Sequence, residues 1–75
     1  MSSPATLVTG ASGFLGRAIM ARLAASGRRA VGLDPRTAPT THVIDDLSDR
    51  ARLRDLIARE GITHIIHSGG VSGRW

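Results

Sequence analysis

The chain has 75 residues, about half of an ordinary domain of ~100–150 residues. Its ten strongly basic residues are all Arg, and it contains no Lys, Tyr or Cys, so these residues supply no disulfide, thiolate metal site, Tyr acid or Lys Schiff base. With 41% hydrophobic and 21% charged residues, the composition is typical of a folded chain and not of a disordered one.

The net charge of +4 is not accompanied by the other features of a nucleic-acid-binding chain. The arginines are scattered, whereas a phosphate-binding surface would need a clustered stripe with aromatic residues for stacking, and only Phe14 and Trp75 are available. No apolar run approaches the ~18 residues of a membrane span, and the N-terminus lacks the apolar core of a signal peptide. We therefore expect a cytoplasmic protein that binds neither nucleic acid nor membrane.

The first predicted elements are a strand and a helix joined by a glycine-rich turn. The apolar run at Ala5–Thr9 predicts a strand that ends where the glycines begin. The spacing of Leu15, Ile19 and Leu23 then predicts the buried face of a helix. Gly27 is expected to end this helix, in the position just after its cap.

Three strands and a second helix complete the predicted pattern. In chain order the remaining elements are a strand over Ala30–Leu33, a short strand over His42–Ile44, a helix capped by Ser48 or Asp49, and a strand over Ile62–His67. The connection between Leu33 and His42 is shorter than a usual parallel crossover, so the third strand is either reached by an unusually short loop or is a stub at the sheet edge. The pattern predicts an α/β fold of Rossmann type, with a parallel sheet of about four strands, two main helices and an incomplete doubly wound arrangement.

Residues 9–16 read Thr-Gly-Ala-Ser-Gly-Phe-Leu-Gly and place three glycines between the first strand and the first helical turn. Gly10 permits a tight turn, Gly13 lets the backbone approach a pyrophosphate, and Gly16 lets helix and strand pack closely. The helix N-terminus offers amide groups and a positive dipole end to phosphates. We expect a bound dinucleotide here, and a purely structural glycine turn is the alternative.

This segment resembles the fingerprint of the extended short-chain dehydrogenase/reductase family, which includes the NAD-dependent epimerases and dehydratases of nucleotide sugars. The resemblance extends over the whole chain and is specific to the cofactor half of that family. It implies that residues 1–75 are the N-terminal part of a dinucleotide-binding domain, and that Ser12 and the backbone of Phe14 and Leu15 lie against the pyrophosphate. Arg17 is interpreted as a solvated side chain, and a contact with the cofactor is the alternative.

Asp34 stands at the end of the second predicted strand. A carboxylate there can accept hydrogen bonds from both ribose hydroxyls of NAD and would repel the 2′-phosphate of NADP. A turn cap beside Pro35 is the alternative role, and the nearby Arg36 guanidinium could pair with a phosphate. NAD is therefore the expected cofactor, with NADP less favoured.

The resemblance implies further cofactor contacts. The pair Asp46 and Leu47 is similar to the family's Asp-aliphatic pair after the third strand, where the carboxylate accepts from the adenine amino group; capping of the second helix is the alternative. The fourth predicted strand is followed by small residues where the family places the ribose and nicotinamide side of the cofactor, namely Ser68, Gly69 and Gly70.

The histidines of the fourth predicted strand do not indicate a metal or a catalytic site. His64 and His67 stand three apart, so their side chains face opposite sides of the strand. We interpret His67 as a packed, hydrogen-bonded residue at the strand end. No metal is expected.

The family's catalytic groups, a Tyr-x-x-x-Lys pair and a Ser or Thr, are implied to lie downstream, and no catalytic residue is assigned within this chain. Met1 suggests a natural start and Trp75 a truncation, so the first hypothesis is the cofactor half of an NAD-dependent epimerase, dehydratase or dehydrogenase. Such an enzyme would transfer hydride from a sugar-like hydroxyl to NAD, and the chain alone is expected to show no turnover. The alternative is a stand-alone nucleotide-binding module that forms a homo-oligomer through an open sheet edge.

Overall fold

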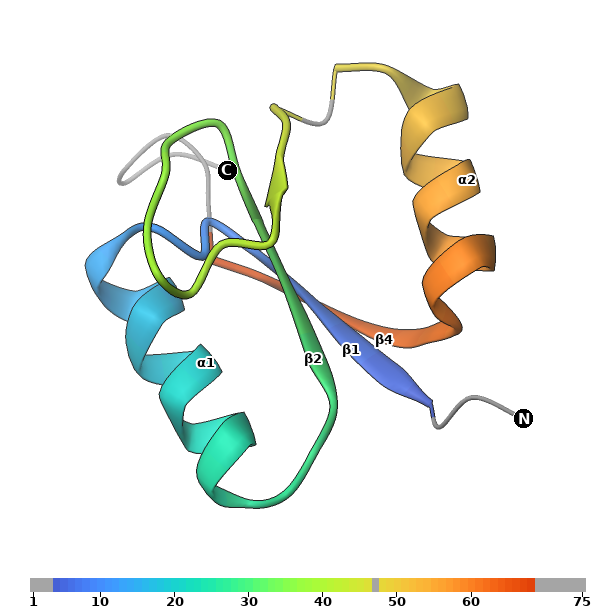
Figure 1. Ribbon diagram of the computed structural model, residues 1–75. Coiled ribbons are helices and arrows are strands. Elements are labelled where there is room, and N and C mark those ends of the chain that lie inside the picture. The colour runs from blue at the N-terminus through green and yellow to red at the C-terminus, as the bar shows by residue number, and fades with distance from the viewer. Residues whose placement is uncertain (1–3, 47, 69–75) are drawn as a thin grey trace.

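Four strands and two helices form the regular structure of residues 4–46 and 48–68, the part of the chain that this computed structural model describes. In chain order the elements are β1 (Ala5–Thr9), α1 (Phe14–Ala25), β2 (Ala30–Asp34), β3 (Val43–Ile44), α2 (Arg50–Glu60) and β4 (Ile62–His67). The strands form one parallel sheet in the order β3-β2-β1-β4, and Figure 1 shows α1 and α2 on opposite sides of it. The predicted Rossmann-type α/β sheet is confirmed.

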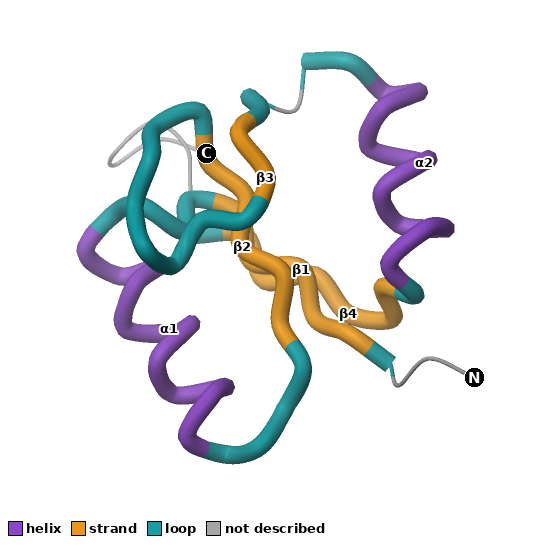
Figure 2. The backbone as a smooth tube through the Cα atoms, in the orientation of Figure 1, coloured by secondary structure: helices purple, strands orange, loops and turns teal. Residues whose placement is uncertain are grey.

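The strand register aligns the carboxyl ends of the three longer strands. Thr9, the last residue of β1, pairs with Leu33 of β2 on one side and with His67 of β4 on the other. The turns that follow β1 and β2 therefore emerge at the same end of the sheet, as Figure 2 shows. This end is where parallel α/β folds bind ligands.

Each face of the sheet has its own hydrophobic core. Because successive strand residues point to opposite faces, the fully buried Leu7 packs toward Leu56 of α2, whereas Val8 packs toward Met20 of α1. Both helices are thus fixed to the sheet by apolar contacts from β1, one of its two inner strands.

The predicted buried face of α1 was partly wrong. Leu15 is 59% exposed, and the buried positions are Gly16 and Met20, with Ile19 and Leu23 partly buried. The helix is rotated because Gly16 lies directly against the backbone of the preceding turn, which carries Leu15 outward. At the other end of α1, Gly27 has φ +71° just after the cap residue, as predicted.

The third strand shows both predicted features: it is a stub at the sheet edge, and an unusually short loop leads to it. β3 is a stub of two residues that pairs with the end of β2, and its predicted first residue, His42, lies outside the strand. His42 instead bonds to Gly32: its amide donates to the Gly32 carbonyl at 2.8 Å, and its Nδ1 accepts from the Gly32 amide at 3.0 Å. The short loop thus returns directly over β2.

The second helix begins after Asp49, which resolves the two predicted caps. The Asp49 carboxylate accepts from the amides of Ala51 at 2.9 Å and Arg52 at 3.2 Å. Gly61 ends the helix in the left-handed conformation, at φ +67°. β4 follows at once and is the outer strand of the described sheet, and association through its edge stays a prediction.

Candidate functional site

The turn between β1 and α1 is shaped by two glycines in different ways. Gly10 adopts φ +73°, a conformation that favours glycine, and its carbonyl accepts from the Gly13 amide at 3.0 Å. A Cβ added at Gly16 would lie only 1.9 Å from the Gly10 carbonyl oxygen. The predicted turn role of Gly10 and packing role of Gly16 are therefore confirmed.

No contact within the described part of the chain requires residue 13 to be glycine. Its φ is −79°, and an added Cβ would meet the Gly10 carbonyl oxygen at 3.4 Å and Arg36 Nη2 at 3.5 Å, which are ordinary contacts. The bare backbone at this position therefore leaves room for a group from outside the chain, next to the start of α1.

The N-terminus of α1 is open to solvent. Gly13 makes no side-chain cap hydrogen bond, the first turn contains no acidic residue, and the Arg17 amide is bonded to the Gly13 carbonyl at 2.9 Å. Phe14 is 88% exposed and Leu15 59%, while the Arg17 side chain is solvated as predicted. The amides of the first turn and the positive end of the helix dipole are therefore accessible to an anion.

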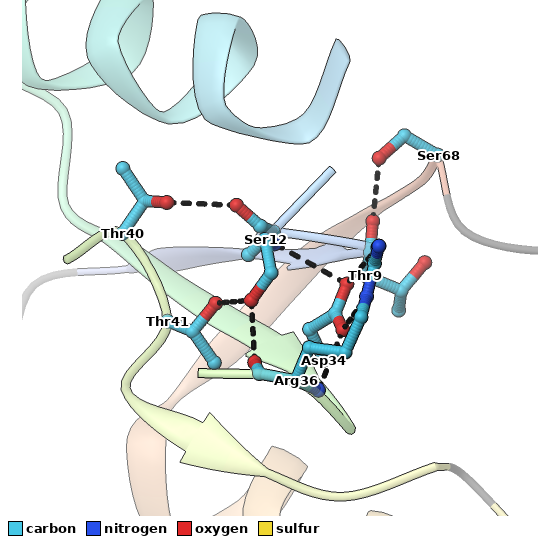
Figure 3. A network of polar contacts seen from close by, with 8 residues as sticks. Thr9, Ser12, Asp34, Arg36, Thr40, Thr41 and Ser68 are labelled. Carbon is cyan, nitrogen blue, oxygen red and sulfur yellow. Dashed lines mark hydrogen bonds and ion pairs between the residues drawn. The ribbon is translucent and has the colours of Figure 1, made fainter. Parts of the chain in front are cut away.

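Asp34 lies beside this turn and is 2% exposed (Figure 3). Its Oδ1 accepts from the Arg36 amide at 2.8 Å and from Arg36 Nε at 3.2 Å. Its Oδ2 accepts from the Ser12 amide at 3.2 Å and from Arg36 Nη2 at 3.4 Å. Burial alone would raise the pKa of Asp34, but the hydrogen bonds from Arg36 and Ser12 and the Arg36 charge outweigh it and hold this pKa below its usual value.

The lowered pKa of Asp34 predicts a loss of stability in acid. Because the folded-state pKa lies below the unfolded value of about 3.9, the stabilisation is fully present above that value and is lost as the pH falls through the folded pKa. We expect the urea midpoint to fall as the pH is lowered from about 4 through the folded-state pKa. The fall should be smaller in Asp34→Asn, whereas Asp46→Asn, which alters an exposed carboxylate, should retain most of it. An equal acid dependence in Asp34→Asn and the unmodified chain would contradict this assignment.

Ser12 fastens the glycine turn to the loop after β2. Its hydroxyl donates to the Arg36 carbonyl at 2.5 Å and lies 2.6 Å from the Thr41 hydroxyl, while the Thr40 hydroxyl donates to the Ala11 carbonyl at 2.7 Å (Figure 3). The Ser12 side chain is thus engaged within the chain, and its predicted pyrophosphate contact stays a prediction. The roles of Thr40 and Thr41 were missed, because nothing in their local sequence indicates a partner so distant in the chain.

Gly32 was also missed, although the sequence contains a signal for it. A Cβ at this position would lie 2.0 Å from the Thr40 carbonyl oxygen and 2.8 Å from the Ala11 Cβ. A glycine inside an apolar strand indicates such a close backbone approach. Gly32 therefore permits the loop to lie over β2, next to the candidate site.

Asp46 lies past the end of β3, exposed in a shallow hollow of about 350 Å³ lined by Pro35, Ile44, Asp45, Asp46, Ser48 and Arg52. Its Oδ1 accepts from the Ser48 amide at 3.0 Å, and hydrogen bonds from Ser48 lower its pKa. Because Asp49 caps α2, helix capping does not account for Asp46. The adenine contact of Asp46 stays a prediction, and Leu47 lies outside the described residues.

The carboxyl ends of β1 and β4 are joined by side chains. The Thr9 carbonyl accepts from the Ser68 hydroxyl at 2.6 Å and from the Ser68 amide at 3.1 Å, and the Thr9 hydroxyl lies 2.5 Å from His67 Nδ1. His67 is hydrogen-bonded as predicted but exposed instead of packed. Ser68 thus lies beside the end of β1, while Gly69 and Gly70 lie outside the described residues.

The predicted site residues that the structure describes lie in a row along the carboxyl ends of the strands. In the order of the strands these are Asp46 after β3, Asp34 at the end of β2, the glycine turn after β1, and Ser68 after β4. Three strand spacings separate the two ends of this row, about 14 Å. The chain leaves β1 toward β2 on one side and returns at β4 on the other, so the row crosses the point where the strand order reverses.

These features define the class of protein: a Rossmann-type fold with a glycine-rich turn at the switch point of a parallel sheet. The NAD dependent epimerase/dehydratase family model matches residues 6–75, and the chain belongs to this family.

One solved structure resembles this chain in both sequence and fold. It is a short-chain dehydrogenase/reductase superfamily protein from Agrobacterium tumefaciens, crystallised with bound NAD, and its identity to this chain is 34% with a TM-score of 0.76. The match covers 92% of this chain and 21% of that chain, so this chain spans about one fifth of the length of that protein. Among curated proteins no significant match was found.

Neither a membrane helix nor a metal cluster is present in the described part of the chain. No helix within residues 4–46 and 48–68 is long and apolar enough to cross a bilayer. No group of three or more His, Asp or Glu side chains in the same ranges could hold a metal ion.

Proposed function

We propose that this chain binds NAD along the carboxyl edge of its sheet, as the cofactor-binding part of an NAD-dependent epimerase, dehydratase or dehydrogenase. The observation that carries the proposal is the buried Asp34 carboxylate beside the open N-terminus of α1. A carboxylate suits ribose hydroxyls, and an uncapped helix N-terminus suits a pyrophosphate. Both groups occur together in a dinucleotide.

The chain's own residues fit this cofactor. Gly13 leaves its backbone bare beside the first helical amides, which would donate to the pyrophosphate together with Phe14 and Leu15. Asp34 would accept from the adenosine ribose, and Asp46 with Leu47 would contact the adenine. When bound, NAD supplies the hydride acceptor.

Ser68, at the far end of the row, would lie beside the nicotinamide side of the cofactor, and the same contact is proposed for Gly69 and Gly70. The carbinol of a nucleotide-sugar-like substrate is the proposed hydride donor in the whole protein. The residues that would bind this substrate are not assigned within this chain. The cytoplasmic location stays a prediction.

A thermal-unfolding series with NAD tests the proposal. Ligand that binds only the folded chain stabilises it by RT ln(1 + [L]/Kd), about 2.7 kcal/mol at one hundred times Kd. We expect the melting temperature to rise with NAD concentration and to stay unchanged with duplex DNA. A melting temperature that does not respond to NAD would contradict the proposal.

Self-association through β4 is a second candidate function, favoured by the exposure of this strand. Ile65 is 52% exposed and Ile66 37%, on opposite faces of an outer strand that pairs with β1. An open, apolar strand edge readily pairs with another strand. Sedimentation should show a homodimer that Ile65→Arg dissociates, whereas Arg54→Glu, an exposed change on α2, should leave it intact. A monomeric unmodified chain would count against this candidate.

A further inference from the structure

The loop between β2 and β3, residues 35–42, is bonded to the glycine turn by a directed chain of hydroxyl groups. The Ser12 hydroxyl donates its only hydrogen to the Arg36 carbonyl at 2.5 Å. Its oxygen lies 2.6 Å from the Thr41 hydroxyl, and because the Ser12 hydrogen is already used, Thr41 is the donor of this bond. Thr41 thus donates to Ser12, and Ser12 donates to Arg36 (Figure 3).

The same loop is attached at a second point of the turn and at β2. The Thr40 hydroxyl donates to the Ala11 carbonyl at 2.7 Å. On the other side, the His42 amide donates to the Gly32 carbonyl at 2.8 Å, and His42 Nδ1 accepts from the Gly32 amide at 3.0 Å. Residues 40–42 therefore connect the glycine turn to β2 directly.

These bonds fix Ser12, which stands between the proposed ribose and pyrophosphate positions. The Ser12 amide donates to Asp34 Oδ2 at 3.2 Å, and Ser12 directly precedes Gly13, whose backbone would approach the pyrophosphate. A displacement of Ser12 would change the separation between the Asp34 carboxylate and the first amides of α1. A site that already has its binding geometry avoids the free-energy cost of being ordered by the ligand.

The bond to Arg36 also limits what the Ser12 hydroxyl can do for a cofactor. A phosphate oxygen that carries negative charge accepts hydrogen bonds and has none to donate. The single Ser12 hydrogen is held by the Arg36 carbonyl, so the hydroxyl could donate to a phosphate only by giving up the loop. The backbone amides at the start of α1 need no such exchange.

We propose that the hydroxyls of Ser12, Thr40 and Thr41 are positioning groups for NAD, which act on the glycine turn and not on the cofactor. They attach the 35–42 loop to the turn and thereby hold the turn and Asp34 at the separation that the dinucleotide requires. This inference rests on the proposed function. Removal of any one hydroxyl should weaken NAD binding, although none of the three touches the cofactor.

Calorimetric titration with NAD tests the proposal. Thr41→Val and Ser12→Ala should each raise the Kd roughly three- to tenfold, which corresponds to the loss of a hydrogen bond. The double variant should bind no more weakly than Ser12→Ala, because Thr41 has already lost its partner in that variant. Thr40→Val breaks the separate bond to Ala11 and should show a similar loss, which covers the case in which another variant is poorly folded.

Two matched variants serve as controls. Thr41→Ser keeps the hydroxyl and should bind NAD within about twofold of the unmodified chain. Thr37→Val makes the same substitution as Thr41→Val at an exposed residue of the same loop and should leave the Kd unchanged.

Amide resonances give a readout that a general loss of stability does not move, because they report on the folded chain alone. Without NAD, Thr41→Val should shift the amide resonances of Ser12 and Gly13 and leave that of Leu7, in the buried part of β1, in place. Thr37→Val should shift neither Ser12 nor Gly13.

The outcomes separate this inference from the proposed function. Matching losses in Thr41→Val and Ser12→Ala, with rescue by Thr41→Ser, support it. A loss confined to Ser12→Ala would mean that this hydroxyl contacts the cofactor directly, and it overturns the inference while NAD binding stands. Unshifted Ser12 and Gly13 amides in Thr41→Val overturn it as well. If the unmodified chain does not bind NAD, the proposed function fails and this inference fails with it.

Discussion

Gly16→Ala is expected to destabilise the chain by about 3 kcal/mol, which is a large part of the stability of a domain of this size. The added Cβ would lie 1.9 Å from the Gly10 carbonyl oxygen and 2.6 Å from the Gly10 carbonyl carbon, and both atoms belong to backbone that cannot move aside as a side chain would. Helix α1 would have to shift away from β1 and give up its apolar contacts around Met20. Urea unfolding followed by circular dichroism measures the loss.

Two other glycines provide controls for this prediction. Gly27 has φ +71° with no heavy atom within 4 Å of an added Cβ, so Gly27→Ala should be destabilised only by backbone strain, about 1–2 kcal/mol. Gly13→Ala should keep its fold and lose affinity for NAD, because its added Cβ meets only ordinary contacts within the chain. A Gly16→Ala variant as stable as Gly13→Ala would show that the close approach of α1 to the turn is not needed.

Asp34→Asn is expected to lower both stability and cofactor affinity. The amide group keeps the shape of the side chain, but its NH2 group is a donor and cannot accept hydrogen bonds from Ser12 or Arg36. Buried N–H groups are therefore left unpaired. The expected loss is about 2 kcal/mol of the free energy of unfolding. Affinity for NAD should fall tenfold or more, because a charge-assisted acceptor for the ribose is lost.

The stability of Asp34→Asn is measured by urea unfolding and its affinity by calorimetry. Asp46→Asn is the matched control for stability, since the same substitution at an exposed carboxylate should change the urea midpoint at neutral pH far less than Asp34→Asn does. Unchanged stability in Asp34→Asn would mean that the network around this carboxylate does not support the fold.

The strands were predicted best, because their signal is local. Ala5–Thr9 and Ile62–His67 have the predicted bounds, since each is an apolar run between turn residues. The orientation of α1 was harder to predict. The hydrophobic spacing placed Leu15 on the buried face, whereas the close contact of Gly16 with the preceding turn directs the Leu15 side chain to solvent. A count of apolar positions does not identify a glycine that packs closely against backbone.

The candidate site was predictable in composition but not in its internal bonding. The position of Asp34 at a strand end follows from the sequence, but its burial and its four donors depend on a loop that folds back over Gly32. The hydroxyls of Thr40 and Thr41 reach the glycine turn from a distant part of the chain. Such contacts arise only when β1 and β2 are paired, so no sequence window contains them.

Binding of NAD along the carboxyl edge of the sheet is best tested by an amide-resolved nuclear magnetic resonance titration of the isotope-labelled chain. Saturable shifts are expected, and they should be largest at Gly10–Gly16, Asp34 and Arg36. Residues at the opposite end of the sheet, such as Arg28 and His64, should be unaffected. Saturable shifts centred on Arg28 and His64, or no shifts at all, would contradict it.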